Sequence, residues 1–176
     1  EQLKKKQKTS SNKHHNDVVG CITKNLLEAM GENPSKWKIE IFVDKSPNAF
    51  ALPGKNMGIH TGMLNLVKNN DQLASVIGHE IGHVIGRHSA ERIADSQTWQ
   101  TATMGATVGA GDMGSIVGSI GQSTLLKNGR GDELESDDLG VLFMIQSGYD
   151  PYETIEVMKI LKAAAGPNRV PEFQST

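Results

Sequence analysis

The sequence predicts an α+β domain that is mostly helical, with a small sheet of about three strands beside one central helix. Three observations support this fold class. Apolar residues recur at helical spacing in several long segments. Between the first two of these segments, short stretches alternate apolar with polar residues, as strands with one buried face do. Turn-forming Gly, Pro, Asn and Ser separate these stretches, so the chain is expected to reverse between them.

The composition indicates one globular domain and argues against some classes of partner. The chain has 176 residues, of which 37% are hydrophobic, so residues 1–176 can form a single domain with its own core. A net charge of −2 and a pI near 6.3 argue against nucleic acid or an anionic membrane surface as the main partner. The single Cys21 excludes an intramolecular disulfide framework, and its apolar neighbours predict a small core residue.

The two ends of the chain indicate an excised domain. The sequence has neither a signal peptide nor an apolar run long enough to span a membrane. It begins without Met and stops abruptly after Thr176, so we expect a longer parent protein. That parent could bring the domain close to a membrane through parts outside this chain. The oligomeric state is not predicted.

The first elements follow from apolar spacing and from turn residues. Residues 1–16 are polar and charged and are expected to form an N-terminal extension. A helix is predicted over residues 17–30, and Gly31 ends it. A short helical pattern also occupies residues 63–67. Extended stretches are expected at residues 37–43, 48–52 and 57–62.

A central helix is expected over residues 71–96, with Asn70 or Asp71 as its N-cap. Phased at 100° per residue, this helix places most of its apolar side chains on one side and His79 and His83 nearly opposite. We therefore expect one face to be buried and the two histidines to face a site. The apolar side holds Leu73, Ile77, Ile81, Val84, Ile85 and His88.

Three glycines, Gly78, Gly82 and Gly86, form a further stripe along the same helix. Each costs about 1 kcal/mol relative to Ala inside a helix. We expect them to permit the close approach of another backbone, either a packed helix or the strand beneath.

The second half of the chain is predicted to hold a glycine-rich segment and two helices. Residues 98–126 are apolar but interrupted by Gly, which suits a helical hairpin, a lid or a membrane-facing loop. We favour a helix-loop segment near the site. An acidic stretch at residues 129–138 opens a helix that ends at Gly148. The last helix is expected over residues 152–165.

Residues 79–83 read H-E-x-x-H, the pattern around which the rest of the site is expected to assemble. On a helix, His79 and His83 lie one turn apart on one face, so both imidazoles can reach one metal ion, usually zinc. Glu80 projects towards the same cleft, where it could take a proton from a metal-bound water. The five letters alone are only moderately specific.

A hydrolytic zinc site usually takes three protein ligands, so the motif needs a third one. Acidic residues that start a later helix supply the candidates, although matching the helix dipole is their simplest role. Glu133 and Asp137 share one face, which suits a ligand and an acceptor that orients a ligand histidine. Calcium binding by the whole cluster lacks the EF-hand spacing. The candidates are Glu133, Glu135, Asp137 and Asp138.

His88 is the other histidine near the motif, and it lies on the apolar side of the predicted helix. A hydrogen-bonded core or helix-terminal histidine is the interpretation we favour over a third ligand. The three-histidine pattern would need a histidine at position 89, which is Ser89.

Ordered blocks along the chain resemble metallopeptidase family forty-eight. This family includes type I CaaX prenyl endopeptidases, HtpX-type quality-control proteases and soluble bacterial-envelope relatives. The resemblance covers nearly the whole chain from about residue 17, and several blocks in order are more specific than one motif. The blocks are N-A-F-A-L-P-G at 48–54, G-M-L at 62–64, A-S-V-I-G-H-E-I-G-H-V at 74–84, R-H at 87–88, R-G-D-E-L-E-S-D-D-L-G at 130–140 and G-Y-D-P at 148–151.

The resemblance implies a zincin-type (gluzincin) peptidase domain with one Zn²⁺ per chain. The family pattern R-x-x-E-x-x-A-D-x-x-G fits Arg130, Glu133, Asp137 and Gly140, so Glu133 inherits the role of third ligand beside the two motif histidines. Ser136 stands where the family usually has Ala, and both residues are small.

The mechanism expected from this resemblance is that of a zinc endopeptidase. Zinc lowers the pKa of a bound water to about 7, and Glu80 takes the proton of that water and later delivers it to the leaving amine. The group that stabilises the oxyanion is not identified by the sequence. The candidates for it are His88, Arg130, Tyr149 and a C-terminal segment beyond residue 176.

The stretch of Asn48, Ala49, Phe50 and Ala51 could serve as an edge strand to which a substrate peptide adds. From the residues alone, an ordinary strand is an equally good interpretation. The resemblance favours the substrate role.

Three hypotheses for function follow. The leading one is an endopeptidase that acts on unfolded or misassembled polypeptides in the bacterial periplasm or cell envelope. The alternative is a metal-containing chaperone or binding module with little turnover. In the third, His79, His83 and Glu133 merely hydrogen-bond and hold no zinc.

Overall fold

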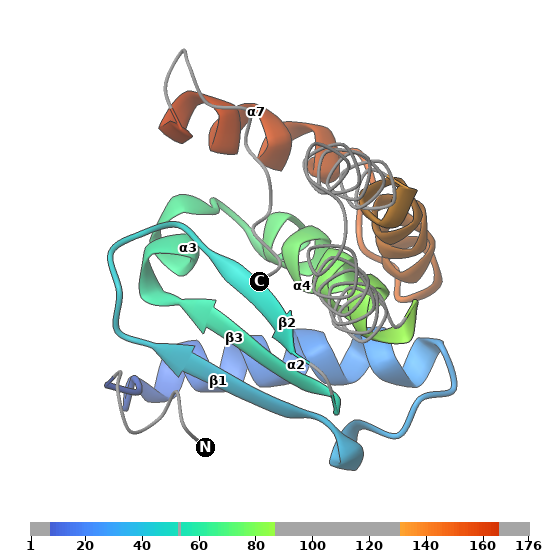
Figure 1. Ribbon diagram of the computed structural model, residues 1–176, viewed down its shortest axis with the longest axis horizontal. Helices are drawn as coiled ribbons and strands as arrows, with labels where there is room; N and C mark the ends of the chain where they lie inside the picture. The colour runs from blue at the N-terminus through green and yellow to red at the C-terminus, as the bar shows by residue number, and fades with distance from the viewer. Residues whose placement is uncertain (1–7, 53, 87–130, 166–176) are drawn as a thin grey trace, which may run out of the picture.

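The structure is a computed structural model, and it describes residues 8–52, 54–86 and 131–165 (Figure 1). One further helix spans residues 131–146 and packs beside α4. The other described elements are, in chain order, α2 (Lys13–Ala29), the 3-10 turn η1 (Pro34–Lys36), β1 (Lys38–Phe42), β2 (Ala49–Leu52), β3 (Asn56–His60), α3 (Thr61–Leu66), α4 (Asn70–Ile85) and α7 (Glu153–Ala165).

The sheet has the strand order β1-β3-β2, so β3 lies in the middle and β2 at one edge. β1 runs parallel to β3, and β2 runs antiparallel to it, with Phe50 opposite Gly58. On the other edge, Thr9 forms an isolated bridge with Phe42. The predicted small sheet of about three strands in a mostly helical α+β domain is therefore confirmed.

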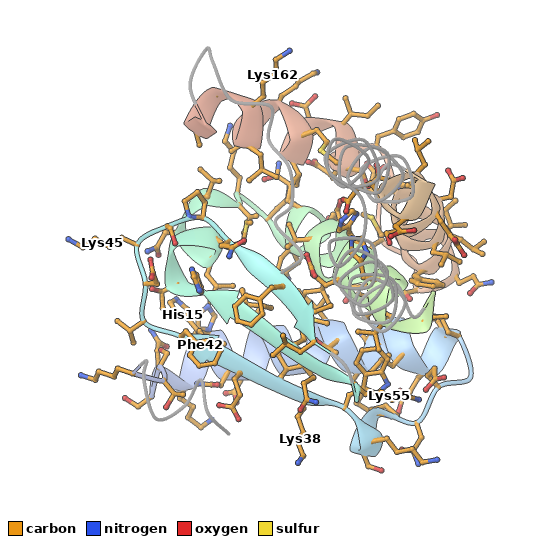
Figure 2. The ribbon with its side chains drawn as sticks, viewed as in Figure 1. His15, Lys38, Phe42, Lys45, Lys55 and Lys162 are labelled. Atoms are coloured by element: carbon orange, nitrogen blue, oxygen red, sulfur yellow. The ribbon has the colours of Figure 1, made fainter. Side chains whose placement is uncertain are left out.

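The core lies between the sheet and the helices. Figure 1 shows α2 running beneath the sheet, and α4 lying between β2 and the C-terminal helices. Ile41 and Ile59 point from the sheet into this core, together with Leu26 and Leu27 of α2. The other sheet face carries a ring cluster in which Phe42 stacks on Phe50, with ring centroids 5.9 Å apart. The surface lysines Lys38, Lys45 and Lys162 project outward from separate parts of the molecule (Figure 2).

α4 is the central helix, and it is buried on every side through most of its length. Each residue from Gln72 to His83 is buried, whereas Ile85 near the end is 36% exposed. The expectation that the histidine side would lie opposite the core is therefore only half right, because the C-terminal helices cover that side. The N-cap is Asn69, whose side chain accepts from the Gln72 amide at 2.8 Å, and not Asn70 or Asp71 as predicted. The helix ends at Gly86 within the described residues, and the predicted continuation to residue 96 lies outside them.

The predicted close approach of another backbone is confirmed at Gly78 and Gly82, where the helix of residues 131–146 crosses α4. A Cβ atom on Gly78 would lie 3.2 Å from the Gly140 carbonyl oxygen, and one on Gly82 would lie 3.0 Å from Ser136 Cα. A Cβ on Gly140 would in turn meet the His79 amide nitrogen at 3.0 Å. The two backbones touch where the motif histidines and the acidic cluster must face each other.

We expect Gly82→Ala to lower the free energy of unfolding by about 1–3 kcal/mol, because its Cβ would press on the backbone of the crossing helix. The matched control is Gly20→Ala on α2, where a Cβ would meet nothing within 4 Å. That control should be stabilising by about 0.5–1 kcal/mol through helix propensity alone. Urea unfolding of both variants measures the difference. Equal stability of the two variants would contradict the close crossing.

Three other expectations can be compared with the structure. α2 begins at Lys13, inside the predicted extension 1–16, because the Asn12 side chain caps it by accepting from the His15 amide at 3.2 Å. Gly31 follows the helix with a φ of +72°, as its position predicted. Cys21 is exposed, so the prediction of a core residue was wrong.

Within the ranges the structure describes, no helix is long and apolar enough to cross a membrane. The glycine-rich segment 98–126 lies outside the described residues.

Candidate active site

The two histidines of the motif lie side by side on α4 and point their Nε2 atoms at each other. The Nε2 atoms are 3.1 Å apart, and the rings meet edge to face. His79 is 4% exposed and His83 is fully buried. At this distance either one Nε2 carries a hydrogen and donates it to the other, or both nitrogens bind one shared metal ion.

Glu133, near the start of the helix of residues 131–146, closes the site from the opposite side. Its Oε2 lies 3.5 Å from His79 Nε2, and its Oε1 lies 3.5 Å from His83 Nε2. Partial burial raises the pKa of Glu133, but hydrogen bonds to His79 and His83 outweigh this effect and hold the pKa well below its usual range. The carboxylate therefore carries its charge at neutral pH.

The three side chains fit a zinc ion. One ligand atom from each of His79, His83 and Glu133 can be chosen so that all lie within 4.8 Å of one another. A tetrahedral zinc ion about 2.0–2.1 Å from each ligand would separate the ligand atoms by about 3.3 Å. The two Nε2 atoms lie 3.1 Å apart, and each lies 3.5 Å from a different carboxylate oxygen of Glu133, so these separations are close to that value. Two imidazoles and one carboxylate are also a donor set that zinc prefers at catalytic sites.

Asp137 forms a hydrogen bond with Nδ1 of His79. Its Oδ1 lies 2.8 Å from His79 Nδ1, so the carboxylate accepts the Nδ1 proton and leaves Nε2 facing the site. Burial lowers the pKa of His79, but the interactions with Asp137 and Glu133 prevail and raise the pKa to about 9. The acidic pair thus makes this imidazole a strong base and a good ligand for a cation.

Glu80 is fully buried, and both of its carboxylate oxygens lack a hydrogen-bond partner among the described residues. Burial raises the pKa of Glu80 to about 7, the nearby Glu133 charge adds to the rise, and His79 opposes it. The amide of Ala51 faces the carboxylate and also lowers its pKa, although it is not placed for a full hydrogen bond. A buried carboxylate that has no protein hydrogen-bond partner, beside a cluster of possible metal ligands, is expected where a base must act on a small molecule such as water.

The predicted substrate stretch forms β2, the edge strand next to Glu80. The His60 amide donates to the Asn48 carbonyl at 2.9 Å. Since bonding alternates along an antiparallel ladder, the backbone groups of Ala49 and Ala51 point away from β3. Both alanines have no exposed surface in the structure, so this edge must be uncovered before a peptide can pair with it.

Tyr149, a predicted auxiliary residue, makes its described side-chain hydrogen bond to α2. Its hydroxyl accepts from the Asn25 side chain on α2 at 3.3 Å. The next residue, Asp150, donates its amide to Asp71 at the start of α4. Asp71 precedes His79 by eight residues, which is about 12 Å along a helix. The other two candidates, His88 and Arg130, lie outside the described residues.

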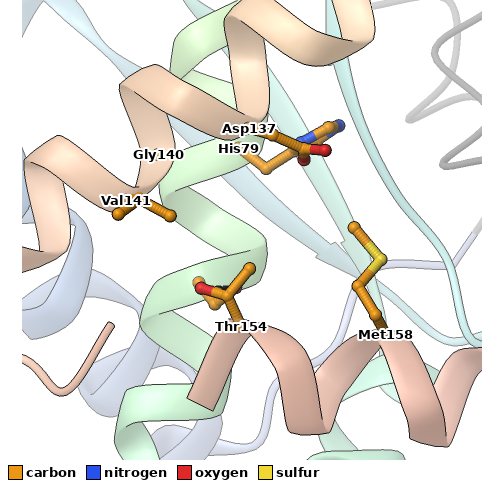
Figure 3. A pocket seen from close by; sticks show the side chains of 7 residues that line it. His79, Asp137, Gly140, Val141, Thr154 and Met158 are labelled. Atoms are coloured by element: carbon orange, nitrogen blue, oxygen red, sulfur yellow. Dashed lines mark hydrogen bonds and ion pairs between the residues drawn. The ribbon is translucent and has the colours of Figure 1, made fainter. Parts of the chain in front are cut away.

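Two hydroxyl residues behind the site had no signal in the sequence. Ser75 of α4 donates to Thr154 of α7 at 3.0 Å, one turn from His79. Nothing in the spacing of either residue indicates this contact, because it arises from the packing of α7 against α4. Figure 3 shows both elements around a pocket that also reaches Asp137.

Comparison with known proteins agrees with the family resemblance of the sequence. The model of Peptidase family M48 matches residues 13–176. The mitochondrial metalloendopeptidase OMA1 of Schizosaccharomyces pombe is 31% identical over 151 residues, which are 84% of this chain and 44% of that protein. The β-barrel assembly-enhancing protease of Escherichia coli K12 is 30% identical over 141 residues, 73% of this chain and 29% of that protein. The chain thus spans less than half the length of these relatives.

Proposed function

The chain belongs to peptidase family M48, and from this membership we propose that it is a zinc-dependent endopeptidase domain. In this proposal His79, His83 and Glu133 hold one Zn²⁺, Asp137 orients His79, and Glu80 is the catalytic base. The substrates are polypeptides in unfolded or misassembled states.

One observation carries the proposal. The Nε2 atoms of His79 and His83 lie 3.1 Å apart and each lies 3.5 Å from a different oxygen of Glu133, and beside them lies a buried carboxylate, Glu80, that has no hydrogen-bond partner among the described residues. A purely structural site would be expected to satisfy the buried Glu80, since an unpaired buried polar group destabilises the fold by about 1–3 kcal/mol. The arrangement is explained if Glu80 is kept ready for a reacting group.

Bound zinc would supply a Lewis acid that polarises the peptide carbonyl and acidifies water. Glu80 would receive the proton of the attacking water at its carboxylate and pass it to the nitrogen of the leaving amine, which breaks the peptide bond. Asp137 would keep the His79 proton on Nδ1 throughout, so that Nε2 faces the site. The buried surroundings of Glu80 exclude bulk water and keep its pKa near 7, which suits a base at neutral pH.

β2 would align the substrate. The outward backbone groups of Ala49 and Ala51 can form ladder hydrogen bonds with an extended peptide, and Asn48 and Phe50 complete the strand. Recognition through the backbone demands an extended conformation and reads few side chains. This is why we propose unfolded or misassembled proteins as the substrate class.

We propose a bacterial cell envelope as the location. The relatives from Yersinia pestis and Escherichia coli are named for β-barrel assembly, and such barrels are proteins of outer membranes. The relatives from Schizosaccharomyces pombe and Arabidopsis thaliana are named as mitochondrial, so a mitochondrial source is the alternative that fractionation of the native cells would reveal.

Proteolysis of an unfolded protein tests the proposed function. We expect casein to be cleaved by the protein as purified, to survive after a chelator has removed the metal, and to be cleaved again after one equivalent of zinc is added. Cleavage that persists without metal would overturn the proposal. Binding of casein with no cleavage in any of the three conditions would instead support a metal-containing chaperone.

A further inference from the structure

A small cavity is lined by His79 and Asp137, and Glu133 is not among its lining residues. The described residues around it come from α4, the helix of residues 131–146 and α7 (Figure 3). Its polar wall consists of Ser75, Thr154, His79 and Asp137, and its apolar wall includes Val141 and Met158.

The volume of the cavity indicates what kind of molecule it can hold. Its volume is about 10 Å³. One water molecule needs about 10–15 Å³ and between two and four polar partners. This volume matches one water molecule, and the polar wall of the cavity supplies the partners that an ordered water requires.

The hydrogen bonds around the cavity leave two acceptors for such a water. Thr154 accepts from Ser75 at 3.0 Å and donates to the Met144 sulfur at 3.4 Å, so its one proton is used. The Ser75 proton is used too, which leaves a lone pair on Ser75 Oγ. Asp137 Oδ1 is engaged by His79, and Oδ2 can accept a further bond.

We propose that one ordered water fills this cavity, donates to Ser75 Oγ and to Asp137 Oδ2, and makes Ser75 and Thr154 positioning residues for His79. The proposal rests on the proposed function, because it gives His79 the role of a metal ligand. The water ties Asp137 to the hydroxyl pair that joins α4 to α7. Asp137 is partly exposed, with 38% of its side chain accessible, so a second fixed contact would restrict its rotation and that of the His79 ring.

Variants that change the hydroxyl pair or the cavity test this inference. Ser75→Ala and Thr154→Val should each weaken zinc binding by about 3- to 10-fold, less than the 10- to 100-fold typical of a direct partner of a ligand. Thr154→Ser keeps the hydroxyl and should bind zinc within about 2-fold of wild type. Val141→Ile keeps both hydroxyls but fills the cavity, and it should weaken zinc binding as Ser75→Ala does. The readout is the zinc dissociation constant from chelator competition.

A buried threonine elsewhere separates positioning from general loss of stability. Thr23 donates to the Val19 carbonyl inside α2 at 2.7 Å, so Thr23→Val removes a comparable hydroxyl far from the site. We expect it to lower the free energy of unfolding of the metal-free protein without changing zinc affinity. If Thr154→Val and Thr154→Ser bind zinc equally well, or if Thr23→Val weakens zinc as much as Thr154→Val, the inference is wrong.

The position of the water is tested independently of zinc by a high-resolution crystal structure of the whole chain. We expect density for one water within hydrogen-bond distance of Ser75 Oγ and Asp137 Oδ2, in the presence or absence of metal. A direct bond between these two side chains, or a cavity without density, would overturn the inference while leaving the zinc peptidase intact. Failure of the wild type to bind zinc would overturn the proposed function, and the crystal structure would still decide on the water.

Discussion

Glu80→Gln should reduce peptide hydrolysis by about 10²–10⁴-fold while leaving zinc bound, because it removes a positioned base but none of the proposed ligands. The amide has nearly the same size as the carboxylate, and the site is fully buried, so the fold should not change. Cleavage of casein by the variant, measured beside its zinc content, gives both results in one preparation. A variant that binds zinc and cleaves as fast as wild type would exclude Glu80 as the base.

The same variant should affect stability in a way that depends on pH. Burial raises the pKa of Glu80 from 4.5 to about 7 in the folded, metal-free protein. Between these two values the folded state binds a proton that the unfolded state releases, so the stability of the wild type falls as pH rises. Gln carries no charge and escapes this loss. Metal-free Glu80→Gln should therefore be more stable than wild type at pH 8, with a difference that shrinks towards pH 4.

Thermal unfolding of the two metal-free proteins at pH 4 and pH 8 checks this dependence. If the difference is the same at both pH values, Glu80 is not the buried titrating group that the structure describes. This test does not use catalysis, so it separates an error about burial from an error about mechanism.

Glu133→Gln should release zinc and abolish cleavage with it. The carboxylate lies 3.5 Å from both ligand histidines and supplies the negative charge of the donor set. An uncharged amide is a much poorer zinc ligand, so we expect zinc affinity to fall by more than the 10- to 100-fold typical of losing an outer partner. Chelator competition measures the fall.

Glu135→Gln is the matched control for this change. Glu135 lies two residues along the same helix, is exposed, and points about 200° around the helix axis from Glu133. The variant removes the same charge from the same helix and should bind zinc within about 2-fold of wild type, as exposed charges near a site contribute little. Equal losses in the two variants would show that overall charge, and not coordination by Glu133, attracts the metal.

The parts of this site that could be predicted are those formed by residues close together in the sequence. His79 and His83 lie four residues apart on one helix, so their common face follows from helix geometry. Glu133 is different, because it was one of four acidic candidates at the start of a helix, and helix geometry does not show which of them faces the histidines. The family resemblance singled it out, and the crossing of the two helices at Gly82 explains why this residue faces the histidines.

The errors also have physical causes. Helical phasing correctly placed Leu73, Ile77 and Ile81 in the core, but Ile85 is exposed. It also could not predict that other helices would bury the histidine side. Cys21 was expected in the core on the evidence of its neighbours, yet it lies on the exposed side of α2. Contacts between distant segments, such as Ser75 with Thr154, leave no periodic signal at all.

The zinc content of the wild-type chain, purified without added metal and then titrated with zinc, tests the central claim most directly. The account predicts one tightly bound zinc ion per chain, held by His79, His83 and Glu133. Absence of stoichiometric zinc after purification, together with no tight binding on titration, would show that these side chains only bond to one another and would contradict the account.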